Sequence, residues 1–160
     1  MLVGARDATR EEWNRRVEEM LVTGRLRVSD VTDDPFGPGR RTERLAQMHE
    51  GVPVFGGTLT RQLEGQRTLA IFGTLYTGVH LRTIPQLTPE DAARMLEELA
   101  GLAPHTAPLP ELVILPIDDG TYRLAYRARI VTRSDAIMYF VDANSGQVLL
   151  AFSDLRRPVM

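Results

Sequence analysis

The sequence has 160 residues, of which 43% are hydrophobic and 25% are charged, and its formal net charge at pH 7 is −2. This composition is typical of globular chains rather than disordered ones, and the near-neutral charge gives no electrostatic reason to bind nucleic acid or anionic membranes. The absence of cysteine excludes disulfides, thiolate metal sites and a cysteine nucleophile. No segment approaches the ~18 apolar residues of a membrane span.

The first half of the chain predicts a helix followed by antiparallel strands. Thr9 and Glu12 have the spacing of a capping box, the next apolar residues recur at helical intervals, and Gly24 stands where helices favour a terminal glycine. We therefore expect a helix over about residues 9–23. From Leu26 the period changes to two, and glycine-containing turns separate strands expected at about residues 41–49, 52–64 and 67–76.

The second half has the same order of elements. Thr88 and Pro89 suit the cap and the first position of a helix, and Gly101 suits its end, so we expect a helix over about residues 88–100. The predicted apolar stripe of this helix consists of Ala92, Met95, Leu96 and Leu99. Strands are expected to follow at about residues 112–117, 121–133, 136–141 and 147–152.

This order of elements predicts an α+β fold of two small units, each with one helix packed on an antiparallel β-sheet. We expect the units to comprise residues 1–78 and 79–160, the second including a C-terminal tail. The pattern weakens between residues 77 and 87, which suggests a linker or an exposed first strand of the second unit.

The sequence contains no motif for catalysis or cofactor binding. A zincin needs two histidines one helical turn apart with a glutamate between them, whereas His49, His80 and His105 are far apart in the chain. A Gly-x-Ser-x-Gly elbow, a phosphate-binding loop and a dinucleotide fingerprint are also absent. We therefore assign no catalytic residue, metal or cofactor, and expect a protein that is not an enzyme.

The segment from Asp142 to Gly146 has two interpretations. Its oxygens at alternate positions resemble the start of a calcium loop, but the later ligand positions of such a loop are missing. The interpretation that we favour is a hairpin turn, which Asp142 opens and Gly146 closes in the left-handed conformation.

The predicted strand over residues 121–133 has two chemically different faces. Its apolar face, which should lie in the core, carries Tyr122, Leu124, Tyr126, Ala128 and Ile130. The other face carries Arg123, Arg127, Arg129 and Arg133. This basic face is either an ordinary solvated sheet surface or a docking site for an acidic partner.

One stretch in the first half resembles a known family. The residues from Arg44 to Gly57 are similar to the Arg-x-x-Gln…Gly-Val-Pro-Val-Phe-Gly segment of the fungalysin/thermolysin propeptide (FTP) domain, although Thr42 stands where that family often has histidine. The glycines and the proline suit turns, bulges and edge positions, whereas the arginine and glutamine either satisfy buried backbone or contact a partner. The motif residues are Arg44, Gln47, Gly51, Pro53 and Gly56.

Two further stretches, residues 122–128 and 139–148, resemble the PepSY domain that follows the FTP domain in precursors of thermolysin-like peptidases. The second stretch contains the Asp-Ala…Gly turn from Asp142 to Gly146. Together with the helix over residues 88–100, the resemblance covers nearly the whole chain and predicts an FTP-like unit followed by a PepSY-like unit.

The resemblance implies a propeptide that inhibits a thermolysin-like zinc metallopeptidase and assists its folding, with the catalytic domain absent from this chain. It also implies secretion or a periplasmic location, although no export signal is recognisable and a cytoplasmic location is the alternative. In such precursors the tail leads toward the catalytic domain, so we expect peptidase contacts from Asp154, Leu155, Arg156 and Arg157.

Two other functions remain open from the sequence alone. The first is a stand-alone binding module that uses the same folds to hold a ligand or an envelope partner without any peptidase. The second is a hydrolase with a dispersed site, which no motif supports.

Overall fold

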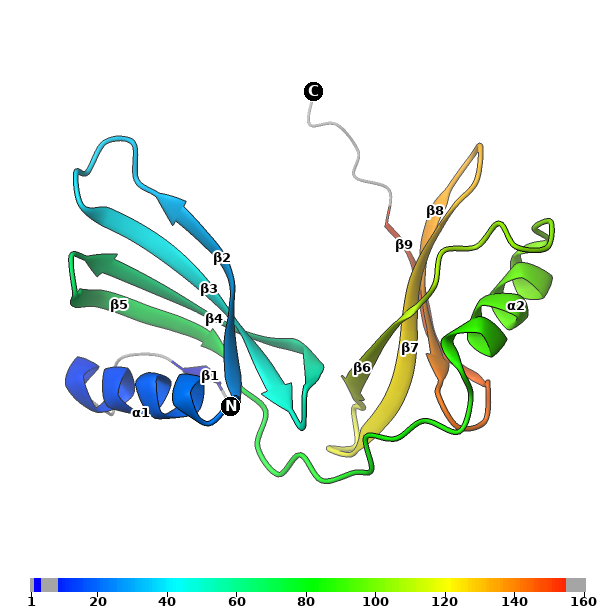
Figure 1. The fold of residues 1–160 in the computed structure, drawn as a ribbon, viewed down its shortest axis with the longest axis horizontal. Helices are drawn as coiled ribbons and strands as arrows, with labels where there is room; N and C mark the ends of the chain where they lie inside the picture. Colours follow the sequence, from blue (N-terminus) through cyan, green and yellow to red (C-terminus); the bar gives the residue numbers. More distant parts are fainter. Residues whose placement is uncertain (1, 4–8, 155–160) are drawn as a thin grey trace. The chain divides into compact units, whose positions relative to one another are not determined.

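The computed structural model describes residues 2–3 and 9–154 of the chain. The chain divides into two compact units, residues 1–79 and residues 80–160, and the predicted boundary lies beside this division. Each unit combines one α-helix with an antiparallel β-sheet (Figure 1), so the α+β fold class is confirmed.

The first unit contains helix α1 (Arg10–Val22) and a sheet in the order β2–β3–β4–β5–β1. Its strands are β1 (Leu2–Val3), β2 (Leu26–Asp33), β3 (Arg40–His49), β4 (Val52–Glu64) and β5 (Arg67–Thr74). The side-chain hydroxyl of Thr9 caps α1 by accepting a hydrogen bond from the Glu12 amide. The core between helix and sheet is formed by Val17, Leu26, Leu45, Leu59, Ile71 and Leu75.

Strand β5 ends two positions before the predicted limit of residue 76. Its last pair with β4 joins Thr74 to Thr58, two residues after Gly56, which has a φ of 80°. Beyond this pair, the side chain of Gln47 takes the place of β4 as a hydrogen-bonding partner of the Tyr76 backbone.

The second unit contains helix α2 (Pro89–Ala100) and a sheet in the order β6–β7–β8–β9. Its strands are β6 (Glu111–Pro116), β7 (Tyr122–Val131), β8 (Ala136–Asp142) and β9 (Val148–Ser153). Thr88 and Asp91 form a capping box at the start of α2, and Gly101 ends it with a φ of 66°. The helix packs on the sheet through Leu96, Ala128, Ile130 and Val141.

The predicted apolar stripe of α2 is partly wrong. Met95 and Leu99 are 38% and 54% exposed, whereas Ala93 and Glu97 are buried beside Ala92 and Leu96. The cause is a loop that folds over this side of the helix: Glu97 Oε1 accepts hydrogen bonds from the backbone amides of residues 106 and 107, at 3.1 and 3.2 Å. A buried acid is tolerated there because its carboxylate is satisfied.

Candidate functional site

Strand β7 carries three of the four arginines that the sequence places on a basic face. Arg123 Nη1 lies 3.4 Å from Asp142 Oδ2, and Arg129 Nε lies 2.7 Å from Asp154 Oδ2. Arg127 forms an ion pair with Glu111 of β6. Each of these arginines therefore faces a carboxylate from another segment, so the charge of the face is largely compensated.

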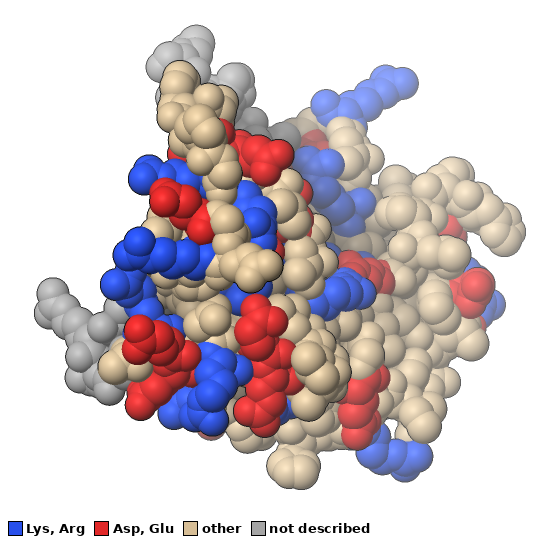
Figure 2. Space-filling model, turned by 60° about the vertical axis from the view of Figure 1, so that its left-hand side comes forward, with Lys and Arg blue, Asp and Glu red and all other residues tan. Residues whose placement is uncertain are grey.

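The fourth arginine, Arg133, does not belong to this face. Strand β7 ends at Val131, and Thr132 opens a turn by exchanging hydrogen bonds with Asp135, so Arg133 lies in the turn between β7 and β8. Arginine and acidic side chains are likewise interleaved on the face of the molecule seen in Figure 2. A partner that docks on the arginines must therefore compete with acids already bound to them.

Only the first of the predicted tail contacts lies within the described residues. The backbone amide of Asp154 donates to the carbonyl of Ala136 at 2.6 Å, while its carboxylate accepts from Arg129. Asp154 thus extends the pairing of β9 with β8. Leu155, Arg156 and Arg157 lie outside the described residues.

Gln47, which lies within the motif of residues 44–57, binds the backbone of Tyr76. Its side chain is buried in β3; Nε2 donates to the carbonyl of Tyr76 at 2.8 Å, and Oε1 accepts from the amide of Tyr76 at 2.8 Å. The side-chain amide therefore pairs with Tyr76 as a neighbouring strand would. Of the two roles considered for Gln47, satisfaction of buried backbone is the one the structure displays.

The glycines of the motif make room for this pairing. A Cβ atom at Gly57 would lie 2.6 Å from Gln47 Oε1 and 2.8 Å from Gln47 Cβ. A Cβ atom at Gly56 would lie 3.2 Å from the Tyr76 hydroxyl oxygen. Gln47, Gly56, Gly57 and Tyr76 therefore form one packed group at the end of the first unit.

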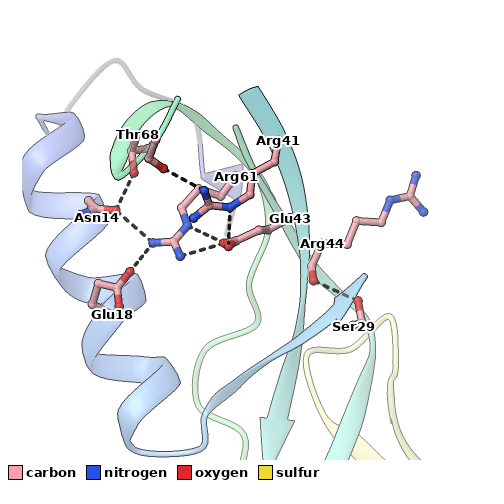
Figure 3. Close-up of polar contacts among 9 residues, drawn as sticks. Asn14, Glu18, Ser29, Arg41, Glu43, Arg44, Arg61 and Thr68 are labelled. Carbon is pink, nitrogen blue, oxygen red and sulfur yellow. Dashed lines mark hydrogen bonds and ion pairs between the residues drawn. The ribbon is translucent and has the colours of Figure 1, made fainter. Parts of the chain in front are cut away.

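The remaining residues of this motif are turn, strand and surface positions. Gly51 has a φ of 80° in the turn between β3 and β4. Pro53 pairs with Met48 of β3, in a part of β4 that does not pair with β5. Arg44 is exposed, and Figure 3 shows its side chain directed away from the neighbouring polar network. Among the described residues, no carboxylate lies within ion-pair distance of it, so a partner contact for Arg44 stays a prediction.

The segment from Asp142 to Gly146 is a hairpin turn, as favoured from the sequence. Asp142 Oδ1 accepts from the amides of Asn144 and Ser145, and the amide of Gly146 donates to the Asp142 carbonyl at 2.9 Å. Gly146 has a φ of 80°. The carboxylate is therefore used within the turn and in the ion pair with Arg123.

A buried polar network in the first unit was missed by the sequence analysis (Figure 3). Arg61 on β4 is 5% exposed and donates to Glu43 of β3 through Nε and Nη2, at 3.0 and 2.8 Å. Its Nη1 donates to Glu18 at 2.5 Å and to Asn14 at 3.1 Å, both on α1. The guanidinium thus connects the helix to two strands.

The charges of this network compensate one another. Burial lowers the pKa of Arg61, but its hydrogen bonds to Glu18 and Glu43 outweigh that effect, so the pKa lies above its usual value. A detectable signal existed in the sequence: Arg61 occupies an inward position between Leu59 and Leu63, where alternation requires an apolar residue or a satisfied charge.

The three histidines lie on separate segments, at the end of β3, in the connection at residue 80 and in the loop at residue 105. Within residues 2–3 and 9–154, no three histidine or acidic side chains are grouped as metal ligands would be. The two helices of the described chain are also too short and too polar to span a bilayer.

Comparisons with known proteins show sequence similarity to part of one larger protein. No family model matches the chain. The chain is 28% identical over 136 residues to the thermostable neutral protease NprT of Geobacillus stearothermophilus, which covers 75% of this chain and 25% of NprT. A solved structure, the Bacillus megaterium YpeB C-terminal domain, superimposes with a TM-score of 0.48 and 12% identity, over 94% of this chain and 67% of that one. This chain is therefore similar to part of a neutral protease, over about a quarter of that protein's length.

Proposed function

We propose that the chain acts as a propeptide, which inhibits a thermolysin-like zinc metallopeptidase and assists its folding without catalysing a reaction itself. The observation that carries this proposal is the similarity of three quarters of the chain to one quarter of a neutral protease. The resemblance of residues 44–57 to the FTP domain, and of residues 122–128 and 139–148 to the PepSY domain, supports it.

The fold is suited to both roles. Each unit has its own helix-on-sheet core, so the chain can present a preformed surface to a partner. A folded unit that binds the native peptidase more tightly than its unfolded chain stabilises the native state by mass action. The same surface inhibits the enzyme if it covers the substrate cleft. A secreted or periplasmic location follows from this proposal.

The test is a reconstitution with a catalytic domain. The thermolysin-like catalytic domain of the source organism, with that of NprT as a second probe, is unfolded and refolded with and without the chain. We expect a higher yield of active enzyme, a stable complex and inhibition of peptide hydrolysis. The variant Arg44→Ser should preserve the fold, because Arg44 is exposed, and weaker inhibition by this variant would assign Arg44 to the contact with the peptidase.

Unchanged refolding yield, unchanged hydrolysis and the absence of a complex with both catalytic domains would contradict the proposal. That outcome would favour a binding module without a peptidase partner.

A further inference from the structure

Strand β9 forms an edge of its sheet that lacks two of the usual protections, charge and proline. Among the described strands it pairs only with β8, and its sequence from Val148 to Ser153, Val-Leu-Leu-Ala-Phe-Ser, contains neither charge nor proline. Val148, Leu150 and Phe152 are 40%, 40% and 39% exposed. An exposed apolar edge of this kind is a template for pairing with another chain.

Strand β2 of the first unit provides an internal comparison. It too pairs with a single described strand, β3, but it carries Arg27, Asp30 and Asp33, and a bulge interrupts its ladder between Val28 and Asp30. Charges and bulges are the features that prevent edge strands from pairing with other molecules. The β9 ladder also has a register shift, between Phe140 and Val141, but residues 150–153 pair with β8 without interruption. This uncharged stretch of β9 is therefore the less protected of the two edges.

The backbone groups of β9 that face outward can be assigned. The amide of Asp154 donates to Ala136, and in an antiparallel ladder alternate residues direct both of their backbone groups to the same side. Phe152 and Leu150, which pair with Met138 and Phe140, therefore bond to β8. Ala151 and Ser153 direct their amides and carbonyls away from β8, toward an added strand.

The surroundings of this edge favour an uncharged occupant. Among the described residues, the arginines of β7 on this sheet face, Arg127 and Arg129, are paired with Glu111 and Asp154. Leu150 and Phe152 lie on the same sheet face as Phe140, whose ring stacks on that of Phe152 with centroids 6.2 Å apart. Within the described residues, an added strand beside Leu150 and Phe152 therefore meets apolar side chains. The carboxylate at the end of this edge, Asp135, already accepts from the hydroxyl of Ser153 at 3.0 Å and from the amide of Ala136 at 2.8 Å. A segment with charges beside Leu150 and Phe152 would lose its hydration without gaining a partner there.

We propose that the free edge of β9 binds an extended, uncharged and apolar segment of the peptidase by strand addition, with Ala151 and Ser153 supplying the backbone hydrogen bonds. This inference rests on the proposed propeptide function and specifies how the partner docks. The side chains of Leu150 and Phe152 then select apolar residues at alternate positions of the bound segment.

The variant Ala151→Pro tests the proposal. It removes an outward amide and leaves the ladder with β8 intact, since proline is tolerated on an edge strand when its nitrogen faces solvent. We expect an unfolding midpoint within a few degrees of wild type and an inhibition constant at least about tenfold weaker, because a backbone hydrogen bond and close strand contact are lost. Ala151→Val, which keeps the amide, should inhibit like wild type.

Leu150→Pro should lower the unfolding midpoint, because it removes an amide that bonds to β8. If Ala151→Pro fails to fold, Ala151→Glu replaces it and should weaken inhibition by introducing a charge beside the apolar segment. If the tested Ala151 variant inhibits the peptidase as strongly as the wild-type chain does, the strand addition is wrong, while the propeptide function stands.

Two other results would reject the proposal for different reasons. A wild-type chain that does not inhibit contradicts the propeptide function and this inference with it. Light scattering that shows a dimer of the chain alone, dissociated by Ala151→Pro, would identify a second copy as the occupant of the edge.

Discussion

The side-chain amide of Gln47 forms hydrogen bonds with both backbone groups of Tyr76, at 2.8 Å each, and so continues the sheet where β5 has lost its partner strand. The pair links residues 29 positions apart in the sequence. Because it closes the last part of the first unit, its removal should be detectable both in global stability and at Tyr76 itself.

The substitution Gln47→Leu should destabilise the first unit by about 1–3 kcal/mol, because a leucine side chain neither donates to the Tyr76 carbonyl nor accepts from the Tyr76 amide. Urea unfolding measures the loss, and amide hydrogen exchange should show faster exchange at Tyr76. Exchange at Tyr76 equal to wild type would contradict the role assigned to Gln47.

A substitution at Gly57 tests the same group from the other side. Gly57→Ala should cost about 1–3 kcal/mol, because its Cβ would lie 2.6 Å from Gln47 Oε1 and 3.2 Å from the carbonyl oxygen of Val54. Gly39 is the control: it has a φ of 76°, and a Cβ atom added there would have no other atom within 4 Å. Gly39→Ala should therefore cost only the conformational term of about 1 kcal/mol and leave exchange at Tyr76 unchanged.

The buried network around Arg61 should be sensitive to truncation. Arg61→Ala leaves Glu43 buried without its main partner, which costs about 3–5 kcal/mol and should unfold much of the first unit. The control, Arg40→Ala, removes the exposed pair with Glu64 and should barely change the urea midpoint. Equal midpoints for the two variants would show that the Arg61 network is not a stabilising link between helix and sheet.

The arginine pairs on β7 should affect association more than stability. Arg127→Ser and Arg129→Ser each break a partly exposed ion pair, so each should cost less than about 1 kcal/mol of folding free energy. If the arginines contact the peptidase, stopped-flow binding should be slower and less dependent on salt. An association rate that matches wild type at both low and high salt would assign these arginines to an ordinary solvated surface.

The capping box of α2 gives a pH-dependent prediction. The backbone amide of Thr88 donates to Asp91 Oδ2 at 3.2 Å, and this hydrogen bond, with a further contribution from the Thr88 side chain, lowers the pKa of the Asp91 carboxyl below its usual range. A lowered pKa means that the ionised form stabilises the fold above the usual pKa, and that this contribution is lost as the pH falls through the lowered value. Asp91→Asn should therefore reduce the dependence of thermal stability on pH in the acid range, as measured by melts from neutral pH downward.

The sequence was informative where structure depends on near neighbours. Thr88, Pro89 and Gly101 give both ends of α2, and Asp142 with Gly146 gives the turn before β9, because caps and tight turns are determined within a few residues. The predicted strand limits and buried helix face were wrong where residues distant in the sequence determine the local structure. Tyr76 lies outside β5 because of Gln47, and α2 buries Glu97 because a later loop donates to it.

The candidate site was predictable to a smaller extent. Alternation placed Arg123, Arg127 and Arg129 on one face, but it could not show that acids from β6, from the end of β8 and from residue 154 would neutralise them. The open edge of β9 could not be inferred either, because the order of strands in a sheet depends on pairings that the local pattern does not encode.

The connection between the two units is attached to the fold at both ends. Tyr76 is bound by Gln47, while Leu87 donates to the carbonyl of Ala143 and accepts from the hydroxyl of Tyr126 at 2.7 Å. The ten residues between these anchors, 77–86, span at most about 36–40 Å when fully extended. Once one unit has bound a partner, the other is confined to a small volume around it, which corresponds to an effective concentration on the order of millimolar. Two weak contacts, one from each unit, would then act together as a tight one, and a single cut within residues 77–86 would release both.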